Sequence, residues 1–228
     1  MHELTLEGGL LVSVLQIILI DILLGGDNAV VIALACRGLP EHLRNKGIFW
    51  GVFGAIALRI VLIFFALKLL ALPYVKIVGA LLLLWIGIKL LREEGGDDHD
   101  VHAADHLFGA IRTIVVADAV MSIDNVIAVA AAAKGDIGLV AFGIVISVPI
   151  IVWGSKLVLK LMDRFPWVIT IGAGLLGWIA GGMLLHDVAL HSVVAGLPTW
   201  WNYVAGAVGA AIVVLAGIPG RRGVSTTK

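Results

Sequence analysis

Long apolar runs separated by short polar breaks dominate this chain. A helix that crosses a bilayer needs about 20 mostly apolar residues. Seven such runs occur, at residues 10–36, 47–70, 73–91, 107–133, 137–160, 167–186 and 201–218. The pattern predicts an all-α membrane protein with seven transmembrane helices.

Composition supports this prediction. Of 228 residues, 61% are hydrophobic and only 14% are charged, and the mean hydropathy is +1.08, which excludes a soluble globular domain. We therefore expect a single transmembrane domain over residues 1–228. The one cysteine, Cys36, excludes an intrachain disulfide. The formal net charge is zero, which by itself says nothing about nucleic acid. The sequence contains no nucleotide-binding loop, so we expect no ATP hydrolysis. We expect neither a nucleic-acid partner nor an enzyme.

Basic residues are distributed unevenly between the ends of the runs. If the N-terminus is outside, twelve Lys and Arg fall at cytoplasmic ends and three at outer ends, with Arg59 left inside the second run. Cytoplasmic loops of membrane proteins are enriched in basic residues. The bias predicts an N-out, C-in orientation.

An internal repeat is visible along the chain. Three residues recur at an offset of 93, as Pro73, Gly79 and Trp85 return at Pro166, Gly172 and Trp178. We therefore expect two copies of a three-helix unit, residues 10–91 and 107–186, followed by a seventh helix at 201–218. Because each unit has three spans, the copies lie in opposite orientations. Such inverted repeats are common in secondary transporters.

Two polar segments interrupt the apolar pattern. Residues 92–106 form a cytoplasmic linker rich in Asp and His, in which weak candidates for capturing a divalent metal are His99, His102 and His106. A solvated linker without a metal is the alternative. After the sixth run, His186, Asp187 and His191 mark either a solvated loop or a place where an exported metal is released.

Four carboxylates stand where a bilayer disfavours charge. The pattern Asp-x5-Asp-Asn occurs twice, as Asp21, Asp27, Asn28 and as Asp118, Asp124, Asn125. An ionised Asp at bilayer depth costs roughly 3 kcal/mol on insertion scales. A bound cation is the simplest compensating partner. Hydrogen bonding of protonated Asp between helices is the alternative, but it explains a repeated pattern poorly.

Helical geometry places part of each motif on one face. In the first motif, Asp21, Gly25 and Asn28 align, whereas Asp27 points about 120° away. Two glycines, Gly25 and Gly26, favour local unwinding that would turn Asp27 toward Asp21 and free backbone carbonyl oxygens.

The second motif lacks the glycine pair. Asp118, Ser122 and Asn125 share a face, and the Ser122 hydroxyl is a candidate accessory ligand. Asp124 is either a ligand or a gate or proton site. In opposite orientations the two motifs would meet near the midplane of the membrane.

The ligand types restrict the ion. Carboxylate, amide and carbonyl oxygens suit Mg²⁺, Ca²⁺ and Mn²⁺, whereas Zn²⁺ and Cu⁺ prefer Cys or His. Met121 either adds a soft ligand that favours Mn²⁺ or serves only in packing. Carboxylates gathered in a low dielectric take up protons readily, so a proton is a candidate counter-ion.

Arg59 is a second deep charge. It lies roughly twelve residues into the second run, which is about half the bilayer. We expect a salt bridge to an Asp of either motif. Arg59 would hold the carboxylates apart or replace the metal in an empty site.

Residues 21–33 and 117–128, with Arg-Gly-Leu-Pro at 37–40, resemble the TerC family of integral membrane proteins. The likeness spans essentially the whole chain, and its length resembles the shorter bacterial branch. The resemblance implies a multi-pass protein of the bacterial cytoplasmic membrane, within the lysine-exporter superfamily. It also implies Mn²⁺ efflux or, in some bacteria, Mn²⁺ supply to exported enzymes. The family's motif acids fall on Asp21, Asp27, Asp118 and Asp124.

We therefore expect a secondary transporter that exports Mn²⁺ and holds no resident cofactor. Two alternatives stay open: an exporter of Ca²⁺ or a cationic amino acid, and a membrane scaffold that metallates exported proteins without transport. The expected partners are the lipid bilayer, the metal ion and a proton counter-ion, and a homo-oligomer is compatible with the sequence.

Overall fold

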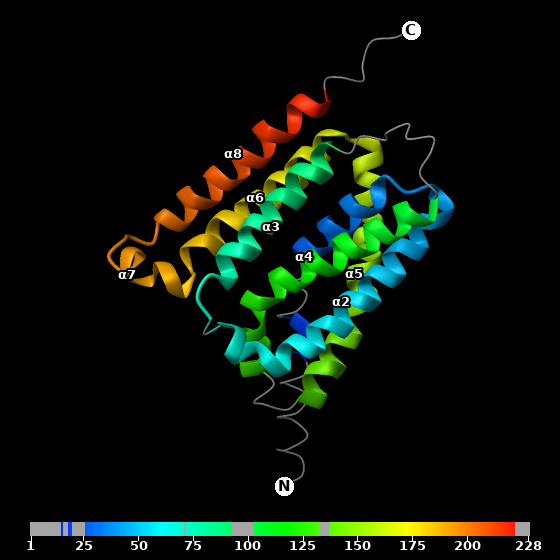
Figure 1. Cartoon of the computed structure of the whole chain (residues 1–228). Coiled ribbons are helices and arrows are strands. Elements are labelled where there is room, and N and C mark those ends of the chain that lie inside the picture. Colours follow the sequence, from blue (N-terminus) through cyan, green and yellow to red (C-terminus); the bar gives the residue numbers. More distant parts are fainter. Residues whose placement is uncertain are drawn as a thin grey trace, which may run out of the picture.

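The chain folds into a bundle of helices (Figure 1). The structure, a computed structural model, describes residue 15 and residues 18–19, 26–70, 72–92, 103–132 and 137–221. The first helix described at length covers residues 26–37 and is called the N-terminal segment below. It is followed by α2 (Glu41–Leu70), α3 (Val75–Arg92), α4 (Ala103–Ala132), α5 (Ile137–Arg164), α6 (Trp167–Leu185), the 3-10 helix η1 (Val188–Leu190), α7 (His191–Val194) and α8 (Trp201–Arg221).

These helices confirm the all-α prediction for the described residues. Five of them are long and apolar enough to cross a membrane, namely α2, α4, α5, α6 and α8. The helix α3 is not among these five, because three of its 18 residues are cationic, namely Lys76, Lys89 and Arg92. The run at 10–36 is described only in part, so the seven-span count and the N-out, C-in orientation stay predictions. α4 begins at Ala103, so the last residues assigned to the polar linker are helical.

The helices form two groups (Figure 1). In one, α3, α6 and α8 pack against one another. Gly177 and Gly181 of α6 allow a close approach, because a Cβ atom at either would collide with the α8 backbone at Gly209 or Ala205. In the other group, α2 packs along α4 and contacts α5.

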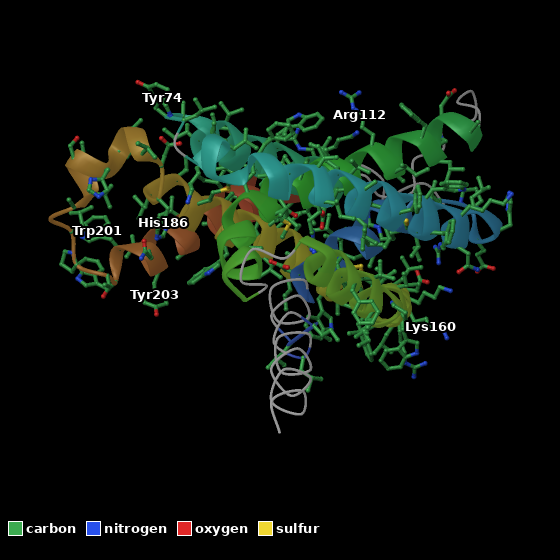
Figure 2. All side chains as sticks on the ribbon, turned by 90° about the horizontal axis from the view of Figure 1, so that it is seen from below. Tyr74, Arg112, Lys160, His186, Trp201 and Tyr203 are labelled. Atoms are coloured by element: carbon green, nitrogen blue, oxygen red, sulfur yellow. The ribbon has the colours of Figure 1, made fainter. Side chains whose placement is uncertain are left out.

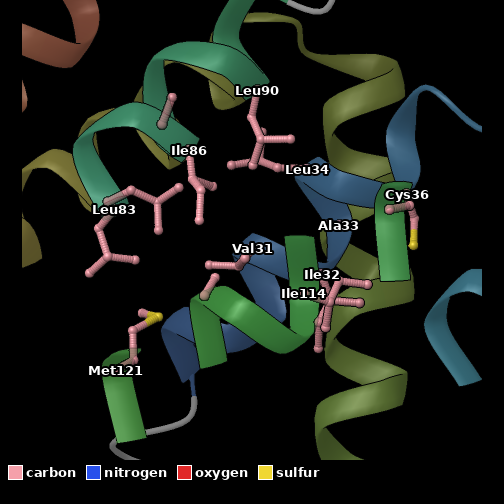
Figure 3. Close-up of a cluster of buried hydrophobic side chains, with 14 of the residues drawn as sticks. Val31, Ile32, Ala33, Leu34, Cys36, Leu83, Ile86, Leu90, Ile114 and Met121 are labelled. Carbon is pink, nitrogen blue, oxygen red and sulfur yellow. The ribbon is translucent and has the colours of Figure 1, made fainter. Parts of the chain in front are cut away.

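A buried apolar cluster joins the groups. Figure 3 shows side chains of the N-terminal segment, α3 and α4 converging, among them Val31, Leu83, Ile86 and Met121. Because these side chains come from both groups, the cluster fixes the position of the N-terminal segment between them.

Two glycines of the predicted repeat pack in a reciprocal manner. A Cβ atom at Gly79 of α3 would lie 2.8 Å from Val120 of α4, and one at Gly172 of α6 would lie 2.8 Å from Val30 of the N-terminal segment. The third helix of each proposed unit thus contacts the first helix of the other. The inverted repeat with boundaries at 10–91 and 107–186 stays a prediction.

The residues labelled in Figure 2 distinguish two ends of the bundle. In Figure 2, Tyr74, His186, Trp201 and Tyr203 lie toward one end, and Lys160 lies toward the other. This separation agrees with the outer and cytoplasmic ends expected from the sequence. Which end faces the cytoplasm stays a prediction.

Asp187 holds together the end of the bundle at which Tyr74 and Trp201 lie (Figure 2). Its carboxylate accepts hydrogen bonds from the backbone N–H groups of Tyr74 (2.9 Å), Lys76 (3.0 Å), Ile77 (3.2 Å) and Ala189 (2.8 Å). Burial raises the pKa of Asp187, but the four hydrogen bonds outweigh this and hold the pKa below its ordinary value. Asp187 is therefore buried and caps the N-terminus of α3. The expectation of a solvated loop was wrong for this residue. The carboxylate oxygens of Asp187 are already occupied by backbone donors, so they are not free to bind an exported metal.

Arg44 makes a similar connection at the opposite end. Its guanidinium donates to the carbonyl oxygens of Arg37 and Leu39, each at 3.1 Å, and pairs with Asp163 of α5 at 2.8 Å. The end of the N-terminal segment is thereby tied to α2 and α5.

Candidate functional site

A cluster of polar side chains lies inside the apolar core. Asn28 comes from the N-terminal segment, Arg59 from α2, and Asp118 and Ser122 from α4. All four are buried, and the most exposed, Arg59, retains only 9% of its surface. Because buried polar groups need partners, their mutual contacts decide whether this cluster is stable.

Asp118 is the centre of the network. Its Oδ1 atom accepts a hydrogen bond from the Asn28 amide nitrogen at 3.0 Å and pairs with the Arg59 guanidinium. Its Oδ2 atom accepts from the Ser122 hydroxyl at 3.2 Å. The expected salt bridge between Arg59 and a motif carboxylate is therefore confirmed.

Ser122 contributes a second link. Its Oγ atom accepts from Arg59 Nε at 3.0 Å, so Arg59 is held at two points, by a carboxylate and by a hydroxyl. Asp118 and Ser122 are four residues apart and face the same side of α4, as helical spacing predicts.

Asn28 carries an unsatisfied acceptor. Its Oδ1 atom is buried and accepts no hydrogen bond among the described residues. Leaving a buried acceptor unpaired costs about 1–3 kcal/mol. Such a cost at the contact between the two motifs marks this oxygen as a candidate ligand atom.

A small cavity lies at the polar cluster. Asn28, Arg59 and Asp118 line it together with apolar residues of α5, namely Ile144, Val148 and Ile151. Its volume of about 20 Å³ is room for one water molecule or one small ion. The sequence did not identify the α5 wall, because its residues look like any other apolar helix face.

Asp27 stands beside the network without joining it. Its carboxylate accepts from the backbone N–H of Asn28 at 2.9 Å and interacts electrostatically with Asp118 and Arg59. Gly26 lies in helical geometry, and a Cβ atom there would meet nothing within 4 Å. Gly25 lies outside the described residues, so the expected local unwinding stays a prediction.

Several predicted site residues fall outside the description. These are Asp21, Gly25, His99, His102 and the side chains of Asp124 and Asn125. Met121 packs in the apolar cluster near Leu83 (Figure 3), and His106 is exposed in the first turn of α4. Within the described residues, no three His, Cys, Asp or Glu side chains are grouped to hold a metal.

The arrangement suits reversible cation binding. One carboxylate is neutralised by one guanidinium, one amide oxygen has no hydrogen-bond partner among the described residues, and Asn28 and Asp118 line a cavity with room for an ion. A cation that enters must compete with Arg59 for Asp118, because both need the same oxygens.

Comparison with known proteins places the chain in a family. The sequence model of the integral membrane protein TerC family matches residues 6–223. The uncharacterized membrane protein YjbE of Bacillus subtilis (strain 168) is 45% identical over 190 residues, which cover 83% of this chain and 87% of that protein.

More distant relatives also match. The membrane protein YceF of the same organism is 27% identical over 78% of this chain and 74% of its own length. The tellurium resistance protein TerC of Alcaligenes sp is 33% identical over 70 residues, which cover 30% of this chain and 20% of that protein. No solved structure matches. The chain belongs to the TerC family of integral membrane proteins.

Proposed function

We propose that this protein is a secondary transporter that exports Mn²⁺ across the bacterial cytoplasmic membrane. The observation that carries the proposal is the meeting of the two motifs, where Asn28 bonds Asp118 beside a cavity and leaves its own amide oxygen unpaired. Oxygen ligands of these types suit a hard divalent cation. Asp27 interacts electrostatically with Asp118, and we assign it as a second carboxylate ligand.

The remaining motif residues complete the proposed coordination. We assign Asp21, Asp124 and Asn125 as further ligands on the basis of the repeated pattern. Mn²⁺ favours carboxylate, carbonyl and water oxygens in octahedral geometry. Asn28, Asp118 and Asp27 alone do not complete six positions, so further oxygen ligands from the chain or from water are needed.

The size of the cavity bears on the alternatives. About 20 Å³ in this conformation has room for a single ion, which supports a metal ion as the substrate. A cationic amino acid stays the alternative that competition in the flux assay decides.

Flux into proteoliposomes tests the proposal. Purified full-length protein should carry Mn²⁺, and Ca²⁺, Mg²⁺ and lysine should compete poorly. Asp118→Asn should lower the flux about tenfold or more, because it removes the central ligand. Asp105→Asn is the matched control on α4, since Asp105 is exposed outside the site. Absence of Mn²⁺ flux from folded wild-type protein, as expected of a metallation scaffold, would exclude transport.

We also propose a proton as counter-ion. Carboxylates in a low dielectric take up protons when a metal leaves. An inward proton gradient should accelerate Mn²⁺ export, and a rate that does not respond to the imposed gradient would contradict this coupling.

A further inference from the structure

Arg59 occupies the position that a transported cation needs. Its guanidinium pairs with Asp118 and is fixed through Nε to Ser122 at 3.0 Å. Asn28 donates to the same Asp118 oxygen. The three contacts that the structure describes at the Asp118 carboxylate are therefore made by a guanidinium, an amide N–H and a hydroxyl, so Arg59 already holds an oxygen that a bound cation would need.

The charge balance of the site shows what a cation at the position of Arg59 contributes. A carboxylate left uncompensated inside a membrane is strongly disfavoured, and so is a helix movement that carries it across the bilayer interior. Pairing with Arg59 neutralises Asp118 when no ion is present. A divalent ion and a guanidinium on the same carboxylate would repel each other, so the two occupy the site in turn.

We propose that Arg59 is a built-in counter-cation: it leaves Asp118 when the substrate cation binds and returns when the ion is released, which allows the empty transporter to reorient. This inference rests on the proposed transport function and assigns Arg59 a role in the transport cycle. Ser122 is a positioning residue, because its hydroxyl links Arg59 to Asp118.

Two modes of transport differ in their need for Arg59. In exchange, the site is loaded each time it crosses, so the carboxylate always has a cation. In net efflux, the site returns without the metal: Arg59 then supplies the positive charge at Asp118, and the counter-ion protons are taken up by the other motif carboxylates. Removing the charge of Arg59 should slow net efflux far more than exchange.

The affinity of the protein for Mn²⁺ provides a second test of Arg59 as a counter-cation. A binding site that spends most of its time occupied by its own guanidinium shows a weakened apparent affinity for the ion. A variant without this internal competitor should therefore bind Mn²⁺ more tightly. A residue with a merely structural role predicts the reverse, because its loss disorders the ligands.

The experiment compares Arg59→Gln with Arg59→Lys in proteoliposomes that have equal pH on both sides. Net Mn²⁺ efflux and exchange of radioactive for unlabelled Mn²⁺ are measured on the same vesicles, and Mn²⁺ binding is measured on the purified proteins. For Arg59→Gln we expect the ratio of net efflux to exchange to fall about tenfold and the affinity to rise about tenfold. Arg59→Lys keeps the charge and should keep the ratio, and the exposed Arg112→Gln is the control for loss of an arginine from the bundle.

The outcomes separate the inference from the transport function. If wild-type protein shows neither flux nor Mn²⁺ binding, the proposed function fails. If wild type transports while Arg59→Gln has an unchanged ratio or weaker Mn²⁺ binding, only the inference is overturned. If Arg59→Gln fails to fold, Arg59→Lys carries the test. Its single ammonium group holds Asp118 less firmly than a guanidinium does, so Mn²⁺ binding should tighten while net efflux persists. Unchanged or weaker Mn²⁺ binding by Arg59→Lys overturns the inference.

Discussion

The Asn28 side chain donates a 3.0 Å hydrogen bond to Asp118, 90 residues further along the chain. This contact joins the last residue of the first motif to the first residue of the second. It leaves the Asn28 amide oxygen buried and without a hydrogen-bond partner among the described residues. If this oxygen is a ligand, as the proposed function requires, Asn28 should matter more for transport than for stability.

Asn28→Ala tests this distinction. The variant removes one donor to Asp118 and also removes the unpaired oxygen, whose burial costs about 1–3 kcal/mol, so the free energy of unfolding should change little. Mn²⁺ affinity should fall about tenfold, because a ligand is lost. Thermal unfolding in detergent and Mn²⁺ binding on one preparation measure both quantities. Strong destabilisation with unchanged affinity would show that Asn28 is structural.

A double-mutant cycle tests the Arg59–Asp118 pair. Removing one partner of a buried ion pair leaves an uncompensated charge, so Arg59→Leu and Asp118→Asn should each cost about 3–5 kcal/mol. The double variant should be less destabilised than the two singles together by about 2 kcal/mol. Unfolding by SDS in mixed micelles gives the free energies.

The Arg44–Asp163 pair provides the control for this cycle. Its side chains are 21% and 46% exposed, and such pairs contribute about 0–1 kcal/mol. Equal coupling in the two cycles would argue that the Arg59–Asp118 pair is no more shielded from water than a surface pair.

Adjacent glycines of α6 test the packing of α6 on α8. A Cβ atom at Gly181 would collide with the backbone of Ala205 and Gly206, whereas one at Gly182 would meet nothing within 4 Å. Gly181→Ala should therefore lower the melting temperature, by an amount that corresponds to about 1–3 kcal/mol of overpacking. Gly182→Ala should leave it unchanged or raise it slightly, because alanine favours the helix. Similar melting temperatures for both variants would contradict this packing.

Asp187 should give the protein an acid-sensitive component of stability. Its folded pKa lies below the ordinary value, so its stabilisation is fully present above the unfolded pKa and is lost as pH falls through the folded pKa. At neutral pH, Asp187→Asn should cost about 1–2 kcal/mol, because the amide nitrogen faces backbone donors. The difference in melting temperature from wild type should shrink below about pH 4.

His191→Gln is the matched control for Asp187, because His191 is exposed in the same loop region. It should leave the melting temperature unchanged at neutral pH. A constant difference between Asp187→Asn and wild type down to acid pH would refute the role of the ionised carboxylate.

Much of the fold is encoded in local patterns. Six described helices coincide with apolar runs of the sequence to within a few residues, except where α2 and α4 begin earlier. These two helices open with polar turns, at Glu41 and at Asp105, which hydropathy alone assigns to loops. A salt bridge from Arg59 to one of the motif Asp residues was predictable, because opposite charges deep in a membrane have few other partners. The structure identifies Asp118 as that partner.

Other features depend on contacts that no local pattern encodes. The capping of α3 by Asp187 joins residues more than a hundred positions apart, and in the sequence this Asp looks like part of a polar loop. The direct Asn28–Asp118 bond and the α5 wall of the cavity likewise require the tertiary arrangement. Sequence therefore identified which residues carry charge, and the structure shows which of the described polar atoms have hydrogen-bond partners.

Anomalous diffraction from crystals soaked with Mn²⁺ tests the central claim most directly. We predict a Mn²⁺ peak between the N-terminal segment and α4, within ligand distance of Asn28 Oδ1 and the Asp118 carboxylate, with Arg59 displaced from Asp118. A peak at another place in the bundle, or an unoccupied site in protein that transports Mn²⁺, would contradict the account.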